Sequence, residues 1–477
     1  MKKILRPILC GGVLAALLCT PSLAAEQGDF SLLVNGEPVA FTDAAPVLKD
    51  GRSFLPVATT FQALGFAQED IVWNGETQSV TASKDGTTIS LTVGDSAVTW
   101  TGPSWSQTSE DGTSGSAGGS GGIAYLDAAP YIDPATNRTY IPVGLVADIL
   151  GCRVAWDGAT STVIIDDVDA ILAENTETYE RMDQYLDYAR KYSQGNYQVE
   201  GSYLLTSAPG EMESGAEIIN TIGGDYNLIS SQTAMQFAMD MSIGGTIMGA
   251  PIAPTDMNLD MRADLDTGML YLYFQSEDLE QLMNNNVQVN GESVEFQIPD
   301  QWYSLDMKAV YDEAYGPGFY EELIALSTAS QEAAFAQTLE KLLKSDTLIL
   351  TSTATTSDYL EALNQLLGDS HFQKSGSTYT STLEQDGVTI LFHLYTSGGQ
   401  VNGYGMEMTA SETTGMEMTM TMEMKGDDMS LLMEMAGMTM EMDGTYRPSS
   451  TAPETEPPAG ATVVDLWELL TTPVSEL

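Results

Sequence analysis

The stretch Gly51-Arg52-Ser53-Phe54-Leu55-Pro56-Val57 decides the fold of the first third of the chain, because it recurs as Arg138-Thr139-Tyr140-Ile141-Pro142-Val143. An Asp-Ala-Ala-Pro sequence precedes each copy, at Asp43 and at Asp127. Leu-Gly follows each copy, and then Trp-Asn-Gly or Trp-Asp-Gly. The shared order and similar spacing indicate two copies of one module.

Each module reads as a small strand-helix-hairpin unit. The apolar run enters a helix that has Pro early and ends at Leu-Gly. A short strand then carries the Trp into a core, and Asn-Gly or Asp-Gly turns the chain into the next strand, at 79–82 or 162–165. The residues that define the module are Arg52, Pro56, Gly65 and Trp73 in the first copy and Arg138, Pro142, Gly151 and Trp156 in the second.

These motifs make residues 30–167 resemble the copper amine oxidase N-terminal-like family, also called stalk domains. The resemblance implies a secreted or envelope protein of a Gram-positive bacterium. The main departure is a Gly/Ser tract at 112–122, inserted before the second copy.

The family name suggests an oxidase, but the residues do not fit one. A copper amine oxidase needs three imidazoles and a quinone-forming tyrosine motif, whereas this chain has two histidines, His371 and His393, and no such motif. Gly118-Gly119-Ser120-Gly121-Gly122 fits a Gly-x-Ser-x-Gly pattern but lies in the Gly/Ser tract, which favours a linker. We therefore expect a non-enzymatic protein without a cofactor. A hydrolase that uses two of the 67 carboxylates is the alternative.

The amino terminus is typical of an exported protein. Residues 1–25 have a basic start, an apolar stretch and a small-residue exit, as in a cleaved signal peptide. Cys19 leaves lipid attachment as an alternative, although Leu18 stands where that processing favours a small residue. Cleavage would leave Cys152 as the only thiol, so no internal disulfide is expected. We expect secretion, with an extracellular or cell-surface location.

The charge excludes several partners. The chain has 67 acidic and 18 basic residues, a formal net charge of −49. Nucleic acid binding requires Lys and Arg at the phosphates, and anionic membrane surfaces repel an acidic chain. No transmembrane segment is expected after the signal peptide.

The whole chain predicts an α+β protein, with two stalk units followed by a large curved antiparallel β-sheet domain with covering helices. The expected segments are a signal peptide (1–25), a tandem stalk (26–168), a linking helix (169–196), a Met-rich β domain (197–446) and a Pro-rich tail (447–477). Strands are expected at 199–206, 217–222, 225–231, 234–243, 257–264, 269–274 and 302–306, and again from 378 to 446. Helices are expected within 308–344 and 358–367.

The Pro-rich tail is expected to be an extended linker. It ends in an amphipathic segment at 463–470. That segment either packs on its own domain or acts as a docking peptide or plug.

The second informative feature is a methionine pattern. Thirteen of the 25 methionines fall between Met406 and Met442, and many alternate with Glu or Thr. Residues two apart in a strand share a face, so one face should be lined by methionine. We expect Met235, Met239, Met241, Met257, Met261 and Met269 to extend it. The residues predicted to face a ligand are Met406, Met408, Met416, Met418, Met420, Met422, Met424, Met433, Met435 and Met440.

Three interpretations of this face remain open. Methionine can fill the core of a curved sheet, it can line an adaptable surface for a lipid, another apolar ligand or a partner protein, or its thioethers can bind Cu(I). The C-terminal two-thirds also resembles, less specifically, bacterial envelope lipoproteins and lipid-carrier half-barrels. That resemblance implies a β domain that binds an apolar ligand or an envelope protein partner.

Overall fold

The computed structural model describes residues 31–49, 51–102, 121–143, 150–192, 194–207, 210–211, 217–247, 250–278, 280–281, 288–289, 292–293, 297–345, 347–385, 387–410 and 417–467. They form two compact units. The N-terminal unit contains residues 31–176 and 340–362, and the β unit contains residues 177–339 and 363–467. The expected signal peptide and most of the Gly/Ser tract lie outside the described residues.

The N-terminal unit is built from three small sheets. Their orders are β12-β13-β1-β2, β10-β11-β4-β3 and β5-β6-β7-β8-β9. The strands are β1 (Ser31–Val34), β2 (Glu37–Pro38), β3 (Val47–Lys49), β4 (Arg52–Pro56), β5 (Ile71–Asn74), β6 (Ser79–Lys84), β7 (Thr87–Thr92), β8 (Ala97–Thr101), β9 (Gly122–Tyr125), β10 (Tyr131–Asp133), β11 (Arg138–Pro142), β12 (Arg153–Asp157) and β13 (Thr162–Asp166). The helices are α2 (Val57–Ala63), η2 (Gln68–Asp70) and α4 (Val168–Glu174).

The two motif copies pair with each other symmetrically. Strand β4 of the first copy runs antiparallel to β11 of the second, with Leu55 opposite Ile141. The ion pairs are exchanged between the copies. Arg52 Nε lies 2.5 Å from the carboxylate of Asp127, and Arg138 binds Asp43 through Nε and, at 3.2 Å, through Nη2. Each arginine therefore finds its carboxylate in the other copy.

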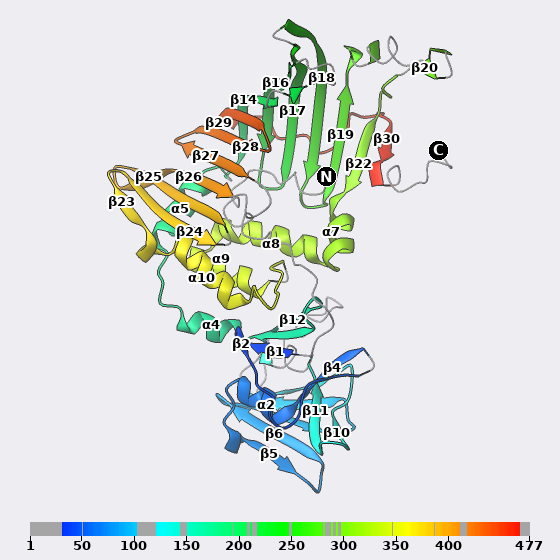
Figure 1. Ribbon diagram of the computed structural model, residues 1–477, viewed down its shortest axis with the longest axis vertical. Coiled ribbons are helices and arrows are strands. Elements are labelled where there is room, and N and C mark those ends of the chain that lie inside the picture. Colours follow the sequence, from blue (N-terminus) through cyan, green and yellow to red (C-terminus); the bar gives the residue numbers. More distant parts are fainter. Residues whose placement is uncertain are drawn as a thin grey trace. The chain divides into compact units, whose positions relative to one another are not determined.

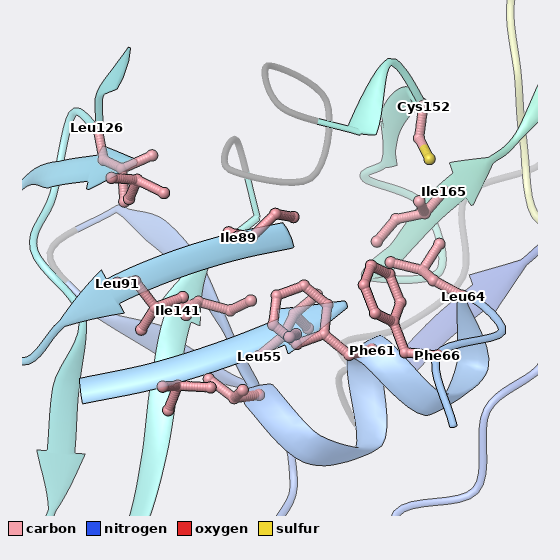
Figure 2. Packing of buried hydrophobic residues seen from close by; sticks show 14 of the residues in the cluster. Leu55, Phe61, Leu64, Phe66, Ile89, Leu91, Leu126, Ile141, Cys152 and Ile165 are labelled. Carbon is pink, nitrogen blue, oxygen red and sulfur yellow. The ribbon is translucent and has the colours of Figure 1, made fainter. Parts of the chain in front are cut away.

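One hydrophobic core joins the three sheets. Phe61 of α2 packs against Phe66 at a ring distance of 4.9 Å, and Figure 2 shows both rings among the aliphatic side chains of the sheets. Cys152 lies at the rim of this cluster (Figure 2). Burial raises the pKa of its thiol to about 12, so the thiol stays protonated and unreactive at neutral pH.

A distant segment, residues 340–362, completes the N-terminal unit. Arg153 donates hydrogen bonds to the carbonyls of Leu343 and Leu348. The carboxylate of Asp157 accepts from the backbone N–H of Ser352 at 3.0 Å, and that of Asp166 accepts from the N–H of Thr356 at 3.1 Å. Residues 340–362 thus hold the β12–β13 hairpin in place, because their backbone groups form hydrogen bonds with three charged side chains of the hairpin, Arg153, Asp157 and Asp166.

The β unit is dominated by one mixed-length, mostly antiparallel 15-stranded sheet (Figure 1). Its order is β23-β24-β25-β26-β27-β28-β29-β14-β16-β17-β18-β19-β22-β30, and β15 pairs with β16 off this path. The strands turn progressively from β23–β26 to β18–β22 (Figure 1), as the natural twist of a sheet requires. The sheet confirms the predicted α+β class with a large curved antiparallel sheet.

The bounds of the β unit's elements follow. The strands are β14 (Asn196–Ser207), β15 (Gly210–Glu211), β16 (Glu217–Ser230), β17 (Ala234–Ile247), β18 (Ala250–Asp264), β19 (Met269–Gln275), β20 (Gln288–Val289), β21 (Glu292–Ser293), β22 (Trp302–Asp306), β23 (Gln373–Ser375), β24 (Thr378–Gln385), β25 (Val388–Ser397), β26 (Gln400–Ala410), β27 (Met418–Lys425), β28 (Asp428–Met435), β29 (Met438–Ser449) and β30 (Val463–Asp465). The helices of the β unit are α5 (Glu180–Arg190), α7 (Met307–Tyr315), α8 (Phe319–Glu332) and η3 (Asp369–His371). Helices α9 (Phe335–Lys344) and α10 (Thr356–Leu367) belong partly to the β unit and partly to the N-terminal unit, which includes residues 340–362. No helix among the described residues combines the length and the apolar character needed to cross a membrane.

Two local predictions differ from the structure. The strands expected at 217–222 and 225–231 form one strand, β16, because Gly223 and Gly224 stay paired with Leu204 and Tyr203 of β14. The single linking helix expected at 169–196 is two helices, α4 and α5, and β14 begins at Asn196. The side chain of Asp167 caps α4 by accepting from the N–H of Ala170, whereas Asp166 binds Thr356.

The tail is not the extended linker that its composition predicts. Glu454 pairs with Arg262 at 2.5 Å, and its N–H donates to Gln236. The chain then adds β30 as a parallel edge strand beside β22. A buried cation and an open sheet edge therefore hold the described part of the tail on its own unit.

Asp157→Ala tests the role of the 340–362 segment. Loss of the acceptor removes the hydrogen bonds that the N–H groups of Ser352 and Ala159 donate, and one of the hydrogen bonds of the Thr160 hydroxyl, so we expect about 2–3 kcal/mol of destabilisation at pH 7. Burial alone would raise the pKa of Asp157, but these hydrogen bonds outweigh burial and lower the pKa to about 2. An unfolded aspartate titrates near ~3.9. The carboxylate therefore contributes stability above about pH 4, which is lost as the pH falls towards 2.

Urea denaturation at several pH values between 7 and 2 measures this contribution. The matched control is Asp127→Ala, which removes an exposed ion pair and should cost less than about 1 kcal/mol. Equal losses for the two variants, or a loss at Asp157 that does not shrink at low pH, would contradict the assignment.

Candidate functional site: the methionine face

The methionines of the last strands lie side by side on one face of the large sheet. Directly opposed residues of antiparallel strands face the same side. Three rows cross β26, β27, β28 and β29: Met408-Met420-Met433-Met440, Met406-Met422-Leu431-Met442 and Ala410-Met418-Met435-Met438. We call this side of the sheet the methionine face.

Tight turns fix this alignment. Lys425 pairs with Asp428, and Met435 pairs with Met438, so two-residue turns join β27 to β28 and β28 to β29. Ala436 and Gly437 have φ values of 50° and 77°, as the turn that matches strand twist requires. A slip of one residue would move the methionines of the slipped strand to the other face and replace most of them with a Glu, Thr, Ser or Asp neighbour.

The methionine face continues into the earlier strands. Met440 pairs with Leu205 of β14, Leu205 with Ile222 of β16, and Ile222 with Ile243 of β17. Met235, Met239 and Met241 of β17 and Met257 and Met261 of β18 lie on the same side. The expectation for Met269 is wrong, because Met269 pairs with Asp264 and Leu270 takes the apolar side.

Of the residues predicted to face a ligand, nine lie on the methionine face, and Met416 lies outside the described residues. The nine are Met406, Met408, Met418, Met420, Met422, Met424, Met433, Met435 and Met440. Their contact with a ligand stays a prediction.

On β17, β18, β27, β28 and β29, the side chains of the methionine face are buried at one end of the strand and become more exposed towards the other end. On β27, Met424 and Met422 are buried, whereas Met420 and Met418 are only half-buried. The same change runs from Met235 to Met241 on β17, from Met261 to Met257 on β18, from Met429 to Met435 on β28 and from Tyr446 to Met438 on β29. Met438 is 39% exposed. We call the half-buried and exposed part the open half of the methionine face.

Helix α5 covers the buried end of the methionine face beside β25 and β26. Its Tyr185 packs edge-on against Phe392 and Tyr404, at ring distances of 6.0 and 5.1 Å. Past the end of α5, the Tyr192 hydroxyl donates to Asp427, and Lys191 pairs with Asp427 at 2.5 Å. The core-filling interpretation is therefore correct for this end of the face.

The opposite face of the sheet carries most of the charged side chains, although Leu204 and Leu432 are also exposed on it. His393 of β25 binds Thr380 through Nδ1 at 2.8 Å, and its Nε2 lies 3.3 Å from the Glu407 carboxylate. The ammonium of Lys425 and the hydroxyl of Tyr395 hold the pKa of Glu423 below its usual range. His393 therefore faces away from the methionines, and His371 is exposed in η3.

Sequence analysis missed a buried cation on the face opposite the methionines. Arg262 stacks on Trp302 with its guanidinium 4.7 Å from the ring centre. It also pairs with Asp260 at 3.1 Å and donates to the Glu456 carbonyl at 2.6 Å. An isolated Arg among aspartates could have suggested a paired charge, but the partner in the tail was not predictable.

The module residues have mostly the expected roles. Pro56 ends β4 and caps α2, Pro142 ends β11, and Gly65 and Gly151 adopt φ values of 84° and 64° after their Leu. The prediction that the tryptophans enter a core is wrong, since Trp73 is 45% and Trp156 47% exposed. Both stand on β5 and β12, which are edge strands of their sheets, so the core does not enclose them.

Comparisons with known proteins identify the first part of the chain. Residues 33–165 match the family model described as the copper amine oxidase N-terminal domain, which confirms the resemblance carried by the two motif copies. No curated protein matches the chain. Among solved structures, a β-barrel-like protein of the domain of unknown function DUF1849 from Brucella abortus is 11% identical, with a TM-score of 0.19, and covers 53% of this chain and 98% of its own.

The residues do not fit the copper centre that the family name suggests. Residues 33–165 contain no histidine. Within the part of the chain that the structure describes, no group of three or more His, Cys, Asp or Glu side chains could hold a metal ion.

Two variants on β27 test the division of the methionine face. Met424→Ala removes a buried side chain and should cost about 2–4 kcal/mol. Met420→Ala, on the same strand and face, removes a half-buried side chain and should cost less than about 1.5 kcal/mol. Urea denaturation measures both values, and hydrogen exchange of the β27 amides assigns the transition to the β unit. Equal costs would mean that the face is sealed along its whole length.

Proposed function

We propose that this is a secreted, cell-surface-associated, non-enzymatic protein whose N-terminal unit serves as a stalk and whose β unit binds an apolar ligand on the open half of the methionine face. The signal-peptide pattern of residues 1–25 supports export. The copper amine oxidase N-terminal domain and its lack of histidine support a structural role for the first unit.

The observation that carries the binding proposal is the uncovered apolar surface. Eight adjacent strands contribute to the open half, from β26 to β18 in sheet order. At about 4.8 Å per strand they span about 34 Å. Extended apolar surfaces of this kind are typical of interaction sites, because a monomer gains nothing from leaving them in water.

The choice of methionine supports an adaptable ligand site. Met has an unbranched, polarizable side chain that can repack around ligands of different shape. A core that needs one packing arrangement would use Leu, Ile or Val, as the core of the N-terminal unit does at Leu55, Ile89 and Ile141. The acidic chain favours a ligand with a neutral or cationic polar end over an anionic one. A lipid chain or an apolar segment of an envelope protein has this chemistry.

Cu(I) binding is a second candidate, favoured by one observation. Met408, Met420, Met433 and Met440 stand in one cross-strand row, so neighbouring thioethers are about 5 Å apart at the Cβ atoms. Soft thioether ligands select Cu(I). Competition titration of Cu(I) against a chromogenic chelator distinguishes this function from lipid binding.

Native mass spectrometry of the mature protein from a Gram-positive secretory host, with organic extraction, tests the binding proposal. We expect a stoichiometric apolar adduct on the wild-type protein. The triple variant Met418→Glu, Met420→Glu and Met433→Glu should lose the adduct and bind a fluorescent fatty acid at least about tenfold more weakly, because charges in the open half oppose apolar contact.

The matched control is the double variant Thr419→Glu and Thr421→Glu, on the same strand but on the opposite face. It should keep the adduct. A wild-type protein that has a clean apo mass and does not take up the fatty acid would refute the proposal, as would equal binding by the triple variant.

A further inference from the structure

The outer face of the five-stranded sheet in the N-terminal unit is a second candidate surface, separate from the methionine face. Its register places one row of residues across all five strands: Val72, Thr81, Ser90, Thr99 and Ile123. The rows on either side add Ser79 with Thr92 and Ser83 with Thr88. The alternate residues, such as Val80, Leu91 and Val98, point into the core. We call the outer side the hydroxyl face.

The hydroxyl face has an ordered, uncharged surface. Thr81 and Ser90 hydroxyls lie 3.3 Å apart, and those of Ser83 and Thr88 lie 2.9 Å apart. None of the outward-pointing residues of β5 to β9 is charged. The face of the large sheet opposite the methionines, by contrast, includes Glu407, Glu423, Glu434, Glu441 and Asp443. In a chain of net charge −49, an exposed sheet face is expected to carry acidic side chains, and the hydroxyl face departs from that expectation.

Apolar side chains stand at both ends of the rows. Tyr125 is 76% exposed, and Ile123 beside it on β9 and Val72 on the opposite edge strand are more than half exposed. Tyr125 pairs with Ala97, so its ring belongs to the hydroxyl face. A flat array of hydroxyls is thus bordered by surfaces that water solvates poorly.

We propose that the hydroxyl face binds a neutral polysaccharide chain. Ser and Thr hydroxyls both donate and accept, so they can satisfy sugar hydroxyls of either orientation. The Tyr125 ring offers a flat apolar surface to the C–H face of a pyranose. The absence of charge on the face fits a neutral polymer, because anions are repelled by the rest of the chain and cations are drawn to its acidic surfaces. The site would attach the protein to a glycan layer independently of the ligand on the methionine face.

The test uses the full mature chain with chitohexaose, a neutral hexamer of N-acetylglucosamine, and isothermal titration calorimetry. We expect saturable binding of chitohexaose and none of hyaluronan, an anionic polysaccharide. The double variant Thr81→Glu and Ser90→Glu should weaken binding at least about tenfold, as should Tyr125→Ala. The matched control, Thr353→Glu, changes an exposed Thr of the same unit outside the face and should bind as the wild type does.

Thermal unfolding confirms that each variant is folded, and Tyr125→Ala keeps the test informative if the charged double variant is not. Wild-type protein without affinity for chitohexaose would overturn the proposal, as would face variants that bind equally or hyaluronan that binds equally. The Met418, Met420 and Met433 triple variant should bind chitohexaose normally, so failure of lipid binding and failure of glycan binding are separate results.

Discussion

Strand register is the constraint on which the rest of the β unit depends. The turns that join β27, β28 and β29 have two residues each, because Lys425 pairs with Asp428 and Met435 pairs with Met438. Turns this short fix the register of the three strands. Because side chains alternate strictly along a strand, the same register that aligns the thioethers also gathers Glu423, Glu434 and Glu441 on the other side. The acidic face and the methionine face of these strands are therefore two results of one alignment. Neither can be altered by an insertion in these strands without disturbing the other.

Much of the fold could be predicted where local sequence determines local structure. The module copies predicted the helix of the first copy and the hairpins that follow both copies, because Leu-Gly and Asn-Gly constrain the backbone within a few residues. The apolar run before the helix, expected to be its entry, instead forms β4 in the first copy and β11 in the second. The predictions were wrong where the structure of a segment depends on residues far from it in the sequence. Whether Trp73 is covered depends on the position of β5 in its sheet, and the Pro-rich tail is ordered by Arg262, almost 200 residues earlier in the chain. Residues 340–362 carry no motif that links them to the first unit, and the connection is visible only in tertiary contacts such as those of Arg153, Asp157 and Asp166.

The candidate site was predictable in part for the same reason. Alternation of Met with Glu and Thr predicted which side chains share a face, and the pairing of β26 to β29 agrees. The alternation could not show which part of that face is buried and which part is open, because this depends on where α5 packs. The apolar pattern of α5 predicts that one side of the helix is buried, but not which strands cover it. Tyr185 between Phe392 and Tyr404 specifies that contact. Sequence periodicity thus identified the candidate ligand-facing residues, and tertiary packing decides which of them water can reach.

In the N-terminal unit, the ion pairs that join the two modules make each module depend on the other. Arg52 meets Asp127 and Arg138 meets Asp43, so a lone module would present an arginine and an aspartate without their counter-ions. Two identical lone modules, brought together across a twofold axis, would satisfy both. The two copies thus stand in the relation that the subunits of a symmetric dimer have to each other. Removal of a single module would leave an arginine and an aspartate of the other module without these partners.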